Sequence, residues 1–112
     1  MALRDQPYLP LYVQDFLTDE RLIECSAAAT GVYIRLMCIM HKSDEYGVIR
    51  LKKKDSITGD VVNDFAGKLM RQMPYNVLTI ADALHELIDE GVLVLDGERL
   101  YQRRMVRDAR LS

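Results

Sequence analysis

The longest apolar stretch of the chain runs from Ala27 to Met40, where nearly every residue is hydrophobic. Ser26, just before it, is a good N-cap, and Lys42 suits the negative end of a helix. A helix that is apolar nearly all round is buried nearly all round, so we expect a helix over about 27–42 at the centre of the core. Gly31 lowers the helix propensity there, and close approach of another backbone is the expected compensation.

Two further stretches have apolar residues at three- and four-residue spacing. The first predicts a helix over about 60–73, broken by Pro74, with Asp64, Lys68 and Arg71 on its polar side. In the second, Thr79 has capping-box spacing and predicts a helix over about 79–90 that Gly91 can end. The exposed face of this later helix is expected to carry Asp82, His85, Glu86, Asp89 and Glu90.

Two segments have the pattern of strands. Residues 48–51 form a short strand that leads into three lysines, and residues 92–103 have the pattern of a β-hairpin with a two-residue Asp96-Gly97 turn. Such a turn places Leu93 opposite Leu100 and Val92 opposite Tyr101. The strand over 48–51 can complete a small three-stranded sheet with this hairpin.

The segment from Tyr8 to Leu17 is rich in aromatic and aliphatic residues and contains Pro10. Proline removes a backbone donor, so we expect an extended arm or edge strand, followed by a short helix that Thr18 can cap. The arm can pack on its own domain, or it can join two copies by strand addition or arm exchange. The candidate residues for self-association are Leu9, Leu11, Tyr12, Val13, Phe16 and Leu17.

The order of these elements is arm, short helix, helix, strand, helix, turn, helix and hairpin. It predicts an α+β fold that is mainly helical, a winged helix-turn-helix with an N-terminal extended arm and a short extra helix. We expect residues 1–25 to form the arm and short helix and residues 26–103 the winged-helix domain. Residues 104–112 then form a basic C-terminal segment, the start of a longer protein.

Charge is unevenly distributed along this chain of 112 residues, whose net charge is −2. The near-balance argues against a protein that coats nucleic acid by bulk charge. However, residues 50–54 and 99–112 are strongly basic, whereas residues 77–98 contain acids but no Lys or Arg. The alternatives are solvated surface charges or contacts with DNA phosphates. The candidate DNA-binding residues are Lys52, Lys53, Lys54, Arg99, Arg103, Arg104, Arg107 and Arg110.

The acidic face of the helix over about 79–90 is a poor reader of duplex DNA. Its carboxylates are repelled by phosphates, and nothing on it can donate bidentately to guanine. This face is expected to meet a basic partner surface or water.

No pattern in the sequence points to catalysis, so we expect no enzymatic activity, cofactor or metal. His41 and His85 lack cysteines at ligand spacing, and the glycines match neither a P-loop nor a dinucleotide motif. Cys25 and Cys38 are expected to be small buried hydrophobes. Without a signal peptide or an apolar run of membrane-spanning length, a cytoplasmic protein with no membrane contact is expected.

Five segments, in this order, resemble the N-terminal winged-helix domain of phage replisome organisers, which are related to the DnaD primosomal proteins and the YdaU-like prophage proteins. The resemblance covers nearly the whole chain, although each segment is mostly core and turn. The segments are Tyr8–Leu17, Thr30–Leu36, Tyr46–Ile49, Ala83–Val92 and Leu100–Asp108.

This resemblance implies a role in starting DNA replication, by binding an origin or helping to deliver a helicase. The partners it implies are DNA, bound non-specifically or at an origin, further copies of the chain in a homodimer or higher oligomer, and a replicative helicase or helicase loader. In DnaD-like proteins the N-terminal domain looks mainly like an oligomerisation scaffold. The alternatives are a pure protein-interaction module of a primosome and a winged-helix transcriptional regulator.

Overall fold

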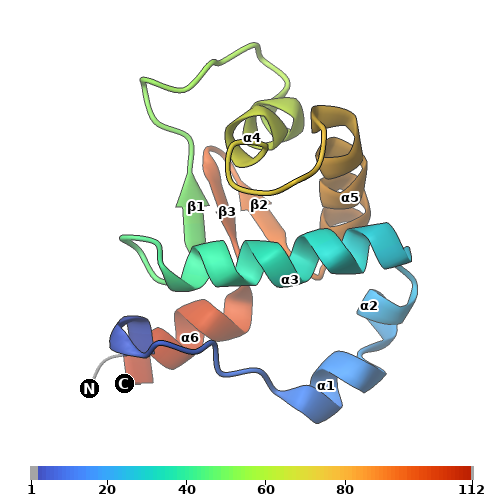
Figure 1. The fold of residues 1–112 in the computed structure, drawn as a ribbon, viewed down its shortest axis with the longest axis vertical. Coiled ribbons are helices and arrows are strands. Elements are labelled where there is room, and N and C mark those ends of the chain that lie inside the picture. Colours follow the sequence, from blue (N-terminus) through green and yellow to red (C-terminus); the bar gives the residue numbers. More distant parts are fainter. Residues whose placement is uncertain (1–2, 112) are drawn as a thin grey trace.

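The fold is α+β and mainly helical, with a small antiparallel sheet, in a computed structural model that describes residues 3–111. In Figure 1, α4, α5 and the sheet lie on one side of α3, and α1 and α6 lie on the other. Within residues 3–111, no helix combines the length and the apolar character needed to cross a bilayer. The elements are a 3-10 turn η1 (Leu3–Asp5), α1 (Val13–Thr18), α2 (Glu20–Ile23), α3 (Ala27–His41), β1 (Val48–Arg50), α4 (Val61–Leu69), α5 (Val77–Asp89), β2 (Val94–Asp96), β3 (Arg99–Tyr101) and α6 (Arg103–Leu111).

Helix α3 confirms the first predicted helix. The Ser26 hydroxyl caps it by accepting from the Ala29 backbone N–H at 3.0 Å. The expected burial on all sides is wrong, because one stripe of the helix faces solvent and includes Arg35 and Cys38. The prediction of two buried cysteines is therefore also wrong, since Cys25 is only half-buried.

Gly31 does not meet another backbone, contrary to expectation. A Cβ atom at this position would lie 3.8 Å from the Tyr75 hydroxyl, which is an ordinary contact with a side chain. The glycine is half-buried beside the exposed stripe of α3, where few atoms approach it.

Helix α5 packs against both α3 and α4, but the limits of α4 and α5 differ from those predicted. Helix α4 ends at Leu69, because the residues leading to Pro74 form turns. Helix α5 begins earlier than predicted, since the Asn76 side chain accepts from the Thr79 backbone N–H at 2.8 Å and is the N-cap. Asn is at least as good a cap as Thr. Gly91, with φ 76°, follows the end of α5 as expected.

The three strands form an antiparallel sheet in the order β1-β3-β2, which confirms the predicted sheet. The hairpin register is different, because Leu100 pairs with Leu95 and with Ile49, and Asp96 pairs with Arg99. The turn residues are therefore Gly97 and Glu98. Gly97 has φ 61° at the first central position, as in a type II′ turn. Because the register shifts by two residues, the side chains that share a face of the hairpin are the same in the predicted and the observed pairing.

The N-terminal segment is only partly extended. Residues 9–12 have no regular structure, but Val13–Thr18 form α1, so the prediction of an extended arm through Leu17 is wrong. Pro10 lies outside this helix and does not oppose it. Thr18 ends α1 and does not cap a helix; Asp19 caps α2 by accepting from the Arg21 backbone N–H at 3.0 Å.

Helix α6 occupies the basic C-terminal segment and packs against the turn before β1. The Gln102 side chain lies at the start of α6, where its Oε1 accepts from the Met105 backbone N–H at 2.7 Å. Its Nε2 donates to the Tyr33 hydroxyl at 3.1 Å. Met105 is buried beneath the helix. The link through Tyr33 joins α6 to α3.

Candidate functional site

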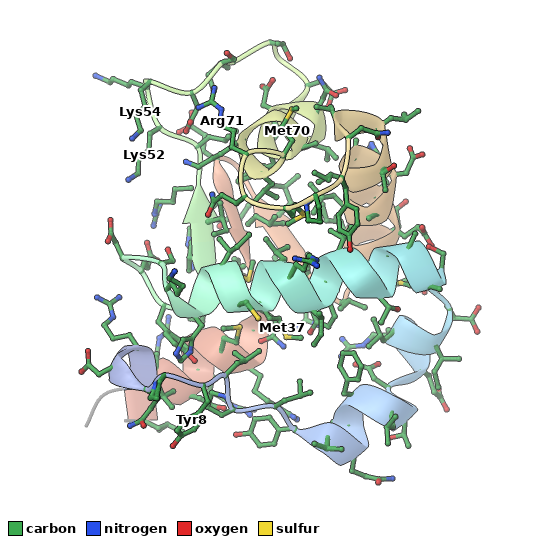
Figure 2. The ribbon with its side chains drawn as sticks, viewed as in Figure 1. Tyr8, Met37, Lys52, Lys54, Met70 and Arg71 are labelled. Carbon is green, nitrogen blue, oxygen red and sulfur yellow. The ribbon has the colours of Figure 1, made fainter. Side chains whose placement is uncertain are left out.

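The three lysines between β1 and α4 are exposed and lie on a loop that projects from one end of the molecule (Figure 2). We call residues 52–60 the basic loop. Within residues 3–111, none of the ammonium groups of Lys52, Lys53 and Lys54 forms an ion pair with an acid. Their charges therefore remain available to a ligand.

The basic loop is anchored at its start by a carboxylate. Asp55 Oδ2 accepts from the Lys52 backbone N–H at 2.6 Å and from Lys68 Nζ at 2.9 Å. Lys68 Nζ also donates to the Arg50 carbonyl at 2.7 Å. The hydrogen bond from Lys52 and the ion pair with Lys68 hold the pKa of Asp55 below its usual value. Lys68, on α4, therefore already binds the Arg50 carbonyl and the Asp55 carboxylate, and both contacts hold the loop.

A second carboxylate anchors the far part of the loop. Asp64 accepts from the Thr58 hydroxyl at 2.7 Å and from the Thr58 backbone N–H at 3.0 Å. These bonds lower the pKa of the Asp64 carboxyl. Asp64 lies on the side of α4 that also carries Asn63 and Lys68, as predicted, but the basic loop covers it, so it is buried. Each anchor is a single carboxylate whose partners are a loop N–H or hydroxyl or a lysine ammonium, and no repeating pattern marks such a residue, so the sequence alone did not predict either anchor.

Two of the candidate arginines already contact acids and aromatic rings. Arg99 lies 3.6 Å from a Glu45 oxygen and 3.7 Å from an Asp96 oxygen, and its guanidinium lies over the Tyr101 ring at 4.3 Å. Arg104 pairs with Asp15, and its guanidinium lies 4.2 Å from the centre of the Tyr12 ring. Both side chains are half-buried, so their charges are partly neutralised within the molecule.

The other three candidate arginines are exposed on α6. Arg103, Arg107 and Arg110 follow one another at spacings of four and three residues, so they share one side of the helix. Arg103 donates to the Gly91 carbonyl at 2.6 Å, and Arg107 lies 3.6 Å from an Asp108 oxygen. This side of α6 is a second basic surface.

The structure does not bring the two basic surfaces together. The basic loop projects beyond α4, whereas α6 lies on the opposite side of α3 (Figure 1). One short ligand therefore cannot touch Lys54 and Arg110 at once.

The acidic face of α5 is largely exposed, as predicted, with one exception. Glu86 accepts from both the backbone N–H and the hydroxyl of Ser26, each at 2.7 Å, and these bonds lower the pKa of Glu86. Glu86 therefore ties α5 to the start of α3. Asp82, His85, Asp89 and Glu90 are exposed.

The residues predicted for self-association divide into two sets. Leu9 and Phe16 pack on the domain's own core, and the Phe16 ring stacks on Tyr33 at 6.4 Å between centroids. The others are exposed, with exposed fractions of 39% for Leu11, 49% for Tyr12, 62% for Val13 and 65% for Leu17.

Behind this segment lies a groove of about 900 Å³, lined by residues of the N-terminal segment, α3 and α6. The Met37 side chain points into this space from α3 (Figure 2). Across the groove the Tyr12 hydroxyl donates to Asp108 Oδ2 at 2.7 Å, and this bond raises the pKa of Tyr12. Together with the pair of Arg104 and Asp15, it fastens the N-terminal segment to α6.

Among residues 3–111 no group of three or more His, Cys, Asp or Glu side chains is placed to hold a metal ion. His41 is buried, with Nδ1 2.8 Å from the Tyr46 hydroxyl and Nε2 2.8 Å from the Gln6 carbonyl. Because a carbonyl can only accept, Nε2 donates to the Gln6 carbonyl, and in the neutral imidazole Nδ1 accepts from the Tyr46 hydroxyl. Both ring nitrogens of His41 are thus engaged in hydrogen bonds within the domain.

Comparison with models of known protein families, with curated proteins and with solved structures found no match to this chain. Function is therefore inferred from the residues and geometry of the chain itself.

Proposed function

We propose that this chain is a winged-helix domain of the replisome-organiser type, which binds the DNA backbone and acts in the initiation of DNA replication. The succession α3-β1-α4-α5-β2-β3, with sheet order β1-β3-β2, supports the winged-helix assignment. The pair of α4 and α5 is then the helix-turn-helix, and the hairpin of β2 and β3 is the wing.

The observation that carries the proposal is the basic loop, where three consecutive exposed lysines form no ion pair with an acid in the described structure. The anchors Asp55 and Asp64 hold the loop in place, so less conformational freedom is lost on binding. Lysines placed in this way suit phosphate oxygens, which position a protein on DNA without reading its sequence.

Sequence-specific regulation is the less favoured function. The exposed face of α5, the recognition helix of the proposed fold, carries Asp82, Asp89 and Glu90. Carboxylates are repelled by phosphates and cannot donate to the acceptors of guanine. This face instead suits a basic surface of a partner, such as a replicative helicase or helicase loader.

The exposed side of α6 is a second DNA contact in this proposal. Arg107 and Arg110 are its main cations, because both are exposed, although Arg107 lies near Asp108. Arg99 and Arg104 are half-buried against acids, and Arg103 donates to a backbone carbonyl. The exposed apolar residues of the N-terminal segment give the domain its self-association surface.

Fluorescence anisotropy with a labelled duplex of mixed sequence tests DNA binding. On a duplex long enough to reach both basic surfaces, contacts by the three lysines and two arginines predict a log–log salt slope of about −4 to −5, since each contact contributes about −0.9. In the Lys52→Ala/Lys53→Ala/Lys54→Ala variant the slope should become shallower by about 3. Lys42→Ala, an exposed lysine after α3, is the control and should leave the slope unchanged. Absence of binding at low salt, or an unchanged slope in the triple variant, would refute the proposal.

A further inference from the structure

Arg71 lies beside the basic loop although it is distant in sequence from the lysines. It follows the end of α4 and is exposed, and Figure 2 shows it at the same end of the molecule as Lys52 and Lys54. Arg71 also lines a small cavity of about 170 Å³ together with Asp55 and Lys68. The arginine and the basic loop thus border the same space.

The two acids that line this cavity, Asp55 and Asp64, already accept hydrogen bonds from neighbouring groups. Asp55 is bonded to Lys68 and to the Lys52 backbone, and Asp64 is bonded to Thr58. Within residues 3–111 Arg71 forms no ion pair with either of them. Its guanidinium charge therefore adds to those of the exposed lysines.

We infer that Arg71 completes a four-cation site, with Lys52, Lys53 and Lys54, for the phosphates of duplex DNA. This inference rests on the proposed function and adds a residue from the turn between α4 and α5 to the contact surface. A guanidinium can hold a phosphate through two parallel hydrogen bonds, whereas lysines act as point charges on flexible stems. Arg71 is accordingly the residue of the site that fixes the position of the DNA backbone.

The geometry favours a phosphate backbone over an acidic peptide as the ligand. The cations come from two separate segments and lie at the projecting end of the molecule (Figure 2). The cavity that Arg71 borders, at about 170 Å³, is below the size of pockets that bury a drug-sized ligand, and none of the three lysines lines it.

Anisotropy titrations of Arg71→Ala and Arg71→Lys on the same duplex test the inference. For Arg71→Ala we expect a salt slope shallower by about 1 and an affinity about 5- to 10-fold lower at 100 mM salt. Arg71→Lys should keep the slope and recover only part of the affinity, because the charge remains but the paired hydrogen bonds do not. Lys42→Ala is again the control, and circular dichroism checks that each variant is folded.

The outcomes separate the inference from the proposed function. If the triple lysine variant loses affinity and slope while Arg71→Ala keeps both, Arg71 is not part of the site and DNA binding stands. A loss of affinity at unchanged slope also overturns the inference, because the arginine then does not contact a phosphate. If wild-type protein fails to bind the duplex, and instead binds an acidic peptide in an Arg71-dependent manner, both statements are wrong.

Discussion

Among single residues, Gly47 occupies a position that tolerates no larger side chain without strain. It has φ 82°, a conformation that residues with a Cβ rarely adopt. A Cβ there would lie 2.8 Å from the Met105 Cβ and 3.1 Å from the Val106 backbone nitrogen. The absence of a side chain at Gly47 is what lets α6 approach the turn before β1.

We expect Gly47→Ala to lower the free energy of unfolding by about 2–4 kcal/mol, the sum of backbone strain and overpacking. Urea denaturation followed by circular dichroism measures the change. Gly59→Ala is the matched control, because Gly59 has φ 100° but no atom within 4 Å of its would-be Cβ. It should cost about 1–2 kcal/mol, from strain alone. Equal losses in the two variants would show that the contact with α6 adds nothing.

At the scale of elements, the loop between β1 and α4 depends on carboxylates rather than on apolar burial. The pKa values of Asp55 and Asp64 are lowered by the hydrogen bonds that hold the loop. Unfolding breaks these bonds and returns the two carboxyls to their ordinary pKa values. In acid, the unfolded chain therefore binds protons at a pH where the same carboxyls of the folded chain are still ionised. The stabilisation from the two groups is complete above about pH 5 and is lost as the pH falls below about 4.

Urea denaturation at pH 7, 5, 4 and 3 should therefore show nearly constant stability down to pH 5 and a decline below it. Asp64→Asn should be less stable than wild type at pH 7 and should show a smaller decline in acid. Asp82→Asn, an exposed change on α5, is the control and should follow the wild-type profile. A wild-type profile in Asp64→Asn would mean that this carboxylate does not anchor the loop.

The elements that sequence analysis predicted well are those with local signals. Ser26 and the apolar stretch after it locate α3, and alternation with a glycine turn locates the hairpin. Where two local signals compete, the prediction is wrong: Asn76 is the cap in place of Thr79, and Gly97 starts the turn in place of Asp96. The anchors of the basic loop bond partners that lie 3, 6 and 13 residues away along the chain, and no periodic pattern encodes them.

On the scale of the whole molecule, the candidate surfaces lie at different places. The basic loop projects at one end, and the N-terminal segment with its groove lies beyond α3 (Figure 1). The lysines of the basic loop and the exposed apolar residues of the N-terminal segment can therefore be changed separately, so the proposed DNA contact of the loop and the proposed self-association can be tested independently.

Val13 and Leu17 are the appropriate positions to test self-association, because Phe16 and Leu9 also support the core. In light scattering we expect wild-type mass to rise with concentration from one chain toward two or more, and Val13→Ser/Leu17→Ser to remain at one. Leu78→Ser, an exposed apolar residue on α5, is the control and should associate as wild type does. A wild-type protein that is monomeric at every concentration would contradict the self-association surface.

The fastening of the N-terminal segment to α6 also determines where attachments can be made. Leu3 and Leu111 line the same groove, and the basic loop projects at the far side of the molecule (Figure 1). A fluorescent label, an affinity tag or a surface linker joined near either of these residues is thereby kept away from the lysines. A protein immobilised through a residue near Leu3 or near Leu111 should present its basic loop to the solution in the same orientation.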